Sequence, residues 1–182
     1  FNDVANKSAT ALNYSRPLMN YPAVTFLDAL LARALLHLLT HVLIAYILFY
    51  GLALFLDAEI QPDYTMIALG YALGALVGMG VGSFNCFLMM SFPVWERIWQ
   101  ILTRPLIFVS GLFLPYDSLP PLAQDILWWN PLIHIVGFLR KGIYGFYEGA
   151  YLSVIFPLLF AGCTMFIGLL LLWRHHTRLL EG

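Results

Sequence analysis

The chain has 182 residues, of which 61% are hydrophobic and only 10% are charged. In soluble domains about 25% of the residues are charged, so this composition excludes a soluble globular protein and indicates an integral membrane protein. Nine Lys and Arg residues and ten Asp and Glu residues give a net charge of −1, which excludes the strongly basic surface of a nucleic-acid-binding protein.

The first 26 residues are mostly polar and contain two pairs that interrupt helices, Arg16-Pro17 and Tyr21-Pro22. We interpret residues 1–26 as a cytoplasmic loop with a short helix, which leads into the first membrane span. The chain begins with Phe1 instead of Met, and it lacks the basic and then apolar start of a signal peptide. We therefore expect that an N-terminal part of the protein precedes this chain.

Three long stretches without a charged residue follow, at 34–56, 65–93 and 150–173. Each exceeds the length of about 20 apolar residues that a helix needs to cross a bilayer. A fourth stretch, 98–114, contains Arg104 and can cross the membrane only if this side chain extends to the nearer interface. We predict an all-α polytopic membrane protein with four transmembrane helices. The spans are expected at about 27–56, 65–93, 98–114 and 150–173, within a transmembrane domain at 27–182.

Residues 115–149 contain no stretch that is long enough to cross the membrane. Residues 132–139 are mostly apolar but would extend only about 12 Å as a helix. Leu122, Ile126 and Trp129 lie on one face of a short amphipathic helix that suits a membrane surface. We therefore predict an outer pair of re-entrant or interfacial helices in this region.

The distribution of basic residues predicts the orientation of the chain. Four crossings place both ends on the same side of the membrane. If that side is the cytoplasm, only Arg140 and Lys141 of the nine Lys and Arg residues lie outside, as the positive-inside rule requires. We therefore expect both ends to be cytoplasmic in a multi-pass protein of the plasma membrane.

A polar stripe runs along the first predicted span. Arg33, His37 and His41 repeat at a spacing of four and therefore share one face of a helix. Ionisable side chains inside a membrane usually face the bundle interior or a water-filled path, so this stripe is a candidate for a substrate path or for a polar seam between helices. A metal site on His37 and His41 is an alternative, but the sequence nearby offers no third ligand, and we expect no metal.

Aromatic side chains gather near the outer end of the same span, at Tyr46, Phe49 and Tyr50. One interpretation is an ordinary aromatic belt at the lipid interface. The other is a polar passage for a carbohydrate, because aromatic faces stack on sugar C–H groups while phenols bond to hydroxyls. Both interpretations remain open at this point.

Glycine recurs at a spacing of four through the second predicted span, at Gly70, Gly74, Gly78 and Gly82. Such a stripe lets the backbone of another helix approach closely. We predict that these four residues form a helix-packing face.

Catalytic and nucleotide-binding signatures are absent from the sequence. There is no GxSxG motif, and neither Lys7 nor Lys141 stands in the GxxxxGK[ST] context of a phosphate-binding loop. We expect no catalytic residue and no cofactor on this chain. If the protein works against a gradient, ATP and Mg²⁺ must bind to a partner subunit.

Four motifs in the second half of the chain form a recognisable series. They are SGLFLP at 110–115, LPP at 119–121, NPLIH at 130–134 and RKGIYG at 140–145. The series resembles the signature region of ABC-2 type permeases. In that family a short span ends in an SG…P turn, an outer re-entrant pair of helices follows, and a last span returns inside.

Two other stretches resemble one branch of that family. They are LMNYPAVTFLD at 18–28, continued by Leu31-Ala32-Arg33, and WERIW at 95–99. The branch exports capsular polysaccharide and O-antigen (lipopolysaccharide) chains across the bacterial inner membrane. The resemblance covers essentially the whole chain.

The resemblance implies six spans per subunit, of which the four spans here would be the third to the sixth. It also implies a homodimer of permeases with two ATPase subunits. Residues 1–26 would be the coupling loop that sits in a groove on the ATPase. The residues expected to contact the ATPase are Asn13, Arg16, Leu18 and Tyr21. Without the first two spans, this chain by itself is not expected to form a transport path.

The resemblance therefore implies the permease subunit of an ATP-driven polysaccharide exporter. An ABC-2 exporter of a small molecule or drug is the nearest alternative, and the stretch at 18–33 favours the polysaccharide branch. A metal-dependent intramembrane enzyme built on His37 and His41 is a more distant alternative, because further ligands are lacking. A structural membrane subunit is the third alternative.

Overall fold

The computed structural model describes residues 1–15, 24–55, 62–145 and 147–181, and all regular structure within them is helical. The predicted all-α class is therefore confirmed for these residues. The elements in chain order are α1 (Asn2–Ala9), α2 (Ala11–Ser15), α3 (Phe26–Phe55), α4 (Tyr64–Ser91), α5 (Trp95–Val109), the short 3-10 helix η2 (Tyr116–Ser118), α6 (Pro121–Leu127), α7 (Pro131–Ile143) and α8 (Ile155–Glu181).

Three helices are long and apolar enough to cross a membrane, at Phe26–Gly51, Tyr64–Ser91 and Ile155–His175. They correspond to three of the four predicted spans. The fourth stretch forms α5, whose 15 residues extend about 22 Å. This length is less than the roughly 30 Å of a bilayer core.

Local side-chain bonds explain where two of the long helices begin. At the start of α3, Thr25 donates its backbone N–H and its hydroxyl to Asp28 Oδ2, over 2.8 and 2.7 Å. At the start of α4, Asp63 Oδ1 accepts the backbone N–H groups of Thr65 and Met66, over 2.9 and 3.3 Å. These bonds satisfy N–H groups that have no partner within the first turn of a helix.

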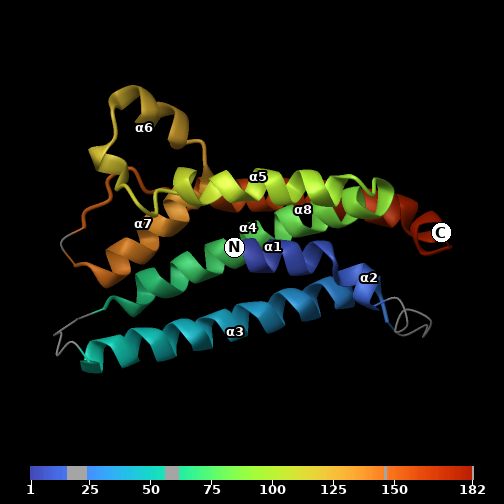
Figure 1. Ribbon diagram of the computed structural model, residues 1–182, viewed down its shortest axis with the longest axis horizontal. Coiled ribbons are helices and arrows are strands. Elements are labelled where there is room, and N and C mark those ends of the chain that lie inside the picture. Colours follow the sequence, from blue (N-terminus) through green and yellow to red (C-terminus); the bar gives the residue numbers. More distant parts are fainter. Residues whose placement is uncertain (16–23, 56–61, 146, 182) are drawn as a thin grey trace.

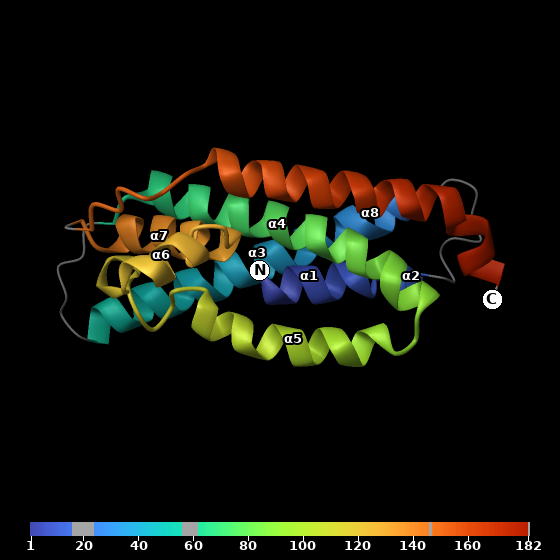
Figure 2. The ribbon, with the colours of Figure 1, turned by 90° about the horizontal axis from the view of Figure 1, so that it is seen from above.

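Helix α4 lies at the centre of the bundle, with α8, α1 and α7 packed along it (Figures 1 and 2). Two groups of buried apolar side chains surround it. The group near α2 contains Ala11, Leu12, Ala29, Leu30, Cys86 and Leu172. The group near α7 contains Leu73, Val77, Leu132, Ile135, Phe138 and Ala161.

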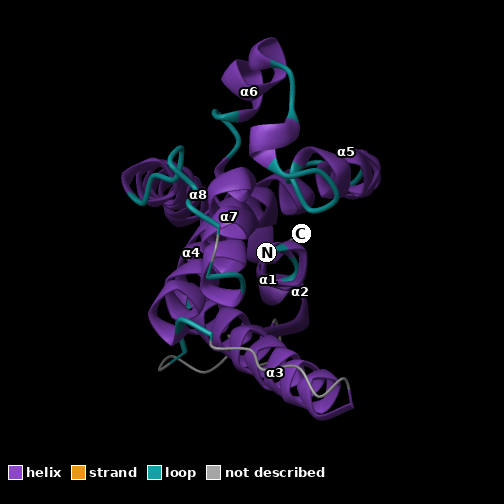
Figure 3. Cartoon of the chain, turned by 90° about the vertical axis from the view of Figure 1, so that its left-hand side faces the viewer, coloured by secondary structure: helices purple, strands orange, loops and turns teal. Residues whose placement is uncertain are grey.

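Part of the segment predicted as a cytoplasmic loop forms helices α1 and α2. Both pack against the long helices, and Val4, Ala5 and Leu12 are buried there. Helix α1 lies between α3 and α5, which are on opposite sides of it (Figures 1 and 3). The polar composition of this segment does not reveal that the buried face of α1 consists of small residues that suit close packing, Val4, Ala5, Ser8 and Ala9.

The four predicted packing glycines face two different helices. A methyl group at Gly70 would lie 2.9 Å from Leu139 Cγ of α7, and one at Gly74 would lie 3.4 Å from Ile135 Cγ2. A methyl group at Gly78 would lie 3.0 Å from Val4 Cβ of α1, and one at Gly82 would lie 2.5 Å from Ser8 Cβ. The glycine face of α4 thus lies against α7 over one half of its length and against α1 over the other.

Candidate transport surface

A groove of about 510 Å³ lies among α3, α4, α5, α7 and the first turn of α1. Its walls are mainly apolar, with contributions from Leu106 and Ile107 of α5. The polar side chains of Asp3, His41 and Tyr71 also line it. Of the six residues predicted to form a substrate path, His41 is the one that lines this groove.

The predicted polar stripe of α3 faces α1 and α2. His41 Nε2 lies 2.6 Å from Asp3 Oδ2, and His41 Nδ1 lies 2.8 Å from the backbone oxygen of His37. At the other end of the stripe, the Arg33 guanidinium lies 4.4 Å from the ring centre of Tyr14, within the range of a cation–π contact. Both ring nitrogens of His41 thus lie within hydrogen-bond distance of an oxygen atom.

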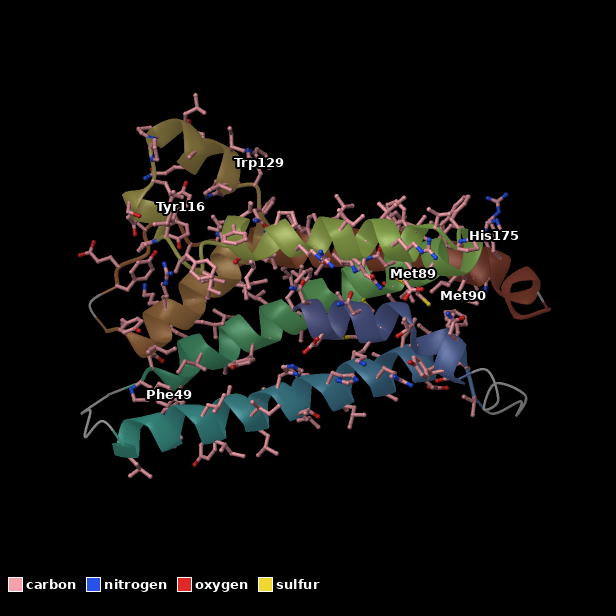
Figure 4. The ribbon with its side chains drawn as sticks, in the orientation of Figure 1. Phe49, Met89, Met90, Tyr116, Trp129 and His175 are labelled. Atoms are coloured by element: carbon pink, nitrogen blue, oxygen red, sulfur yellow. The ribbon has the colours of Figure 1, made fainter. Side chains whose placement is uncertain are left out.

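The predicted aromatic residues of α3 form one cluster beyond the groove. The rings of Tyr46 and Tyr50 are 4.5 Å apart, and those of Phe49 and Tyr50 are 5.8 Å apart in an edge-to-face arrangement. The hydroxyls of Tyr50 and Tyr64 lie 2.6 Å apart and join the end of α3 to the start of α4. Phe49 lies on the side of α3 that faces α4 (Figure 4).

The remaining predicted positions are described only in part. Asn13 is exposed on α2, whereas Arg16, Leu18 and Tyr21 lie outside the described residues. Within the residues that the structure describes, no three His, Cys, Asp or Glu side chains gather where they could hold a metal ion.

The cap is our name for η2, α6, α7 and the turns that join them to α5 and α8. It begins at a sharp turn, in which Gly111 has a φ of +76°, a conformation that glycine adopts without steric cost. The Ser110 hydroxyl donates to the backbone oxygen of Ile107 over 2.8 Å. These two roles explain why the sequence motif has serine and glycine at this point.

Two motif residues join α7 to the end of α5. Asn130 Oδ1 accepts the backbone N–H of Leu132 over 3.1 Å and so caps α7. The Asn130 side chain also donates to the backbone oxygen of Val109 over 3.0 Å. Arg140 Nη2 donates to the backbone oxygen of Leu112 over 2.7 Å. The motif at 130–134 and the motif at 140–145 therefore hold the turn after α5 in place.

His134 connects two further parts of the cap, and its side chain is fully buried. His134 Nδ1 accepts the backbone N–H of Ser153 over 3.2 Å. His134 Nε2 lies 3.0 Å from the backbone oxygen of Trp128 and must carry the proton, because the other nitrogen is the acceptor. The neutral ring thus bridges the end of α6 and the segment before α8. The NPLIH motif at 130–134 contains this histidine, but the sequence pattern alone assigns it no role.

Aromatic rings enclose the bridge that His134 makes. Tyr116 and Tyr151 stack with ring centres 4.0 Å apart, and Figure 4 shows Tyr116 between α6 and α7. The Tyr147 and Tyr151 hydroxyls lie 3.0 Å apart. Burial raises the pKa of Tyr151 far above its usual range and lowers the pKa of His134 below 6.5. The interior of the cap therefore favours neutral side chains.

Acidification is expected to destabilise the cap through His134. Because burial lowers the pKa of His134 in the folded protein, the unfolded chain takes up a proton first as the pH falls below 6.5. The stabilisation that the neutral His134 ring contributes to the folded protein is therefore complete above that pH, and it is lost as the pH falls through the pKa of His134 in the folded protein. Melting temperatures measured from about pH 7.5 to about pH 5 test this, since this window contains the titration of histidine. His134→Gln should show a smaller pH dependence, and an equal dependence in both proteins would contradict the assignment.

The family model for the ABC-2 type transporter matches residues 7–144 of the chain. The polysialic acid transport protein KpsM of Escherichia coli is 31% identical over 172 residues, which are 94% of this chain and 66% of that protein. The capsule polysaccharide export inner-membrane protein BexB of Haemophilus influenzae is 28% identical over 170 residues, 93% of this chain and 64% of that protein.

A third relative extends the same similarity at lower identity. The capsule polysaccharide export inner-membrane protein CtrC of Neisseria meningitidis serogroup B is 23% identical over 143 residues, 79% of this chain and 54% of that protein. The chain thus spans just under two thirds of the length of the relatives that it matches over most of its own length.

Proposed function

Because the chain belongs to the ABC-2 type transporter family, we propose that it is the permease subunit of an ATP-driven exporter of capsular or lipid-linked polysaccharide. The observation that carries this proposal is the match to a polysialic acid transport protein, which is 31% identical and covers 94% of the chain. Two proteins named for capsule polysaccharide export support the same substrate class. The chain would supply the membrane passage, and a partner subunit would bind and hydrolyse ATP with Mg²⁺.

In the proposed layout α3, α4, α5 and α8 are the third to sixth spans, and the cap is the outer re-entrant pair. Helix α5 and the turn after it would together cross a locally thinner part of the bilayer, and the Arg104 side chain would extend to the inner interface. Both ends of the chain would be cytoplasmic, with the cap outside, as the distribution of Lys and Arg favours. The protein would lie in the bacterial inner membrane as a homodimer.

The proposed coupling segment is the part of residues 1–26 that leads from α2 to α3. Asn13 is exposed on α2, where a partner subunit has access to it, and Arg16, Leu18 and Tyr21 follow closely in the chain. ATP binding would close the ATPase pair and move this segment. The spans would then rearrange around a passage, and the polymer would move outward.

The proposed substrate path follows α3 along its length. Arg33, His37 and His41 would lie along its inner half, where His41 already lines the groove with Asp3. Tyr46, Phe49 and Tyr50 would contact sugars near the outer exit. The accessible Tyr46 ring, 59% exposed, supports this role because aromatic faces stack on sugar rings.

Replacing Tyr46, Phe49 and Tyr50 together with alanine is expected to reduce polysaccharide export by about tenfold or more. Loss of three stacking contacts of about 0.5–1.5 kcal/mol each underlies this estimate. Polymer at the cell surface, measured at equal amounts of permease, tests the prediction. Tyr144→Ala provides a control on an exposed cap tyrosine, and unchanged export in the triple variant would overturn the assignment.

Co-purification tests the proposed function as a whole. The protein is tagged, extracted from its native membrane in several mild detergents, and its partners are identified by mass spectrometry. A stoichiometric subunit with the GxxxxGK[ST] motif is expected. If no such subunit appears in any detergent, the ATP-driven exporter is the wrong assignment.

A further inference from the structure

Helix α5 differs from the other long helices because none of its 15 residues is buried. It lies along the outside of the bundle (Figure 2), on the opposite side of α1 from α3 (Figures 1 and 3). Its last turns nevertheless form part of the groove wall, through Leu106 and Ile107. A shift of α5 would therefore change the width of the groove while only Leu106, which packs against the buried group near α7, changes its contacts with that group.

Two hydrogen bonds attach the first two turns of α5 to different helices. Trp95 Nε1 donates to Asn85 Oδ1 of α4 over 2.9 Å. Trp99 Nε1 donates to Asn6 Oδ1 of α1 over 2.8 Å. Trp95 and Trp99 are four residues apart and so lie on the same face of α5. One face of this helix is thus bonded to α4 at one position and to α1 one turn later.

These bonds hold α5 more specifically than apolar contacts would. An indole N–H that loses its acceptor in apolar surroundings costs free energy, whereas apolar surfaces exchange neighbours at little cost. The anchor on α4 is deeply placed, since Asn85 is 1% exposed. Asn6 lies on α1, which continues through α2 into the proposed coupling segment.

We propose that the Trp99–Asn6 hydrogen bond transmits movement of the coupling segment to α5, and that the Trp95–Asn85 bond is the pivot. This inference rests on the proposed function. A displacement of α1 pulls on Trp99 while Trp95 stays fixed on the central helix. Helix α5 then tilts together with the turn that Asn130 and Arg140 bond to its end, and Leu106 and Ile107 move the groove wall. Asn6, Asn85, Trp95 and Trp99 are positioning residues in this scheme.

Trp99→Phe tests the transmission, because it keeps an aromatic ring and removes the N–H donor. The protein and its ATPase are purified together and reconstituted into vesicles, and polysaccharide transport is measured per ATP hydrolysed. Trp99→Phe is expected to lower this ratio by about fivefold or more, the usual range for coupling between sites. Trp95→Phe is expected to lower the melting temperature instead, because Asn85 then loses its partner in a buried position. Trp129→Phe, which alters an exposed ring of the cap, should change neither quantity.

A double replacement separates transmission from simple stability. Asn6→Leu with Trp99→Phe removes both polar partners, so the melting temperature should equal that of the wild type while the transport ratio stays low. An unchanged ratio in Trp99→Phe, or a ratio that recovers in the double variant, would overturn the inference and leave the proposed function intact. A wild-type preparation that lacks an ATPase or moves no polysaccharide would overturn both.

Discussion

Replacing Gly168 with alanine is expected to destabilise the protein by about 1–3 kcal/mol, the usual cost of overpacking a well-packed interior. A methyl group at this position of α8 would lie 2.5 Å from the backbone nitrogen of Phe84 and 2.7 Å from the backbone carbon of Ser83. Backbone atoms do not move aside as a flexible side chain would, so α4 and α8 would have to separate.

A second contact between α4 and α8, at Gly80 of α4, has the same constraint. A methyl group at Gly80 would lie 2.6 Å from the backbone oxygen of Ala161 and would also meet the Thr164 hydroxyl. The close approach of α4 and α8 therefore depends on glycine in both helices. Gly80→Ala should destabilise the protein by a similar amount.

Gly162, which lies on α8 like Gly168, provides the matched control. A methyl group at Gly162 would meet no atom within 4 Å, so Gly162→Ala should be neutral, or stabilising through the higher helix propensity of alanine. Gly168→Ala and Gly162→Ala are compared by their melting temperatures in detergent, measured from the amount of protein that stays monodisperse after heating. Equal melting temperatures for Gly168→Ala and Gly162→Ala would contradict the structure of the α4–α8 contact.

Replacing His134 with leucine is expected to destabilise the cap strongly. Leucine has a similar volume but provides neither the acceptor for Ser153 N–H nor the donor for the Trp128 backbone oxygen. Each buried polar group that loses its partner costs about 1–3 kcal/mol. The loss should concentrate in the segment before α8 and in α6, which the imidazole ring joins.

His134→Gln distinguishes loss of hydrogen bonds from loss of shape, because its amide has one donor group and one acceptor. Melting temperature should fall in the order wild type, His134→Gln, His134→Leu. Proteolysis within the cap should accelerate most in His134→Leu, since local opening exposes its backbone. A leucine variant as stable as the wild type would show that the two bonds are not maintained in the folded protein.

The glycines of α4 show where sequence reasoning reached its limit. The spacing of Gly70, Gly74, Gly78 and Gly82 indicates one packing face, but spacing says nothing about which helix lies against it. In the structure α7 and α1 share this face. Gly80 lies outside that register, and Gly168 lies on α8. That both positions require glycine follows only from the close crossing of α4 and α8.

Histidines illustrate the same limit for polar contacts. The spacing of His37 and His41 places them on one face of a helix, but the partner of His41 is Asp3 on another helix. The motif at 130–134 marks His134 as part of a recognised series, whereas its bond to Ser153 forms across 19 residues of chain. Trp95 and Trp99 belong to the WERIW motif at 95–99, and their asparagine acceptors became evident only in the fold.

The amino-acid sequence alone predicted an all-helical membrane chain with four spans, three of which form helices long and apolar enough to cross a membrane, and it carried the resemblance to a family. The reason is that each segment must satisfy the bilayer by its own length and composition. The packed fold was needed to assign neighbours: α1 against α4, Asn6 beside Trp99, and His134 between Trp128 and Ser153. These contacts join residues from separate segments of the chain, and they depend on helix crossings that no local pattern of residues encodes.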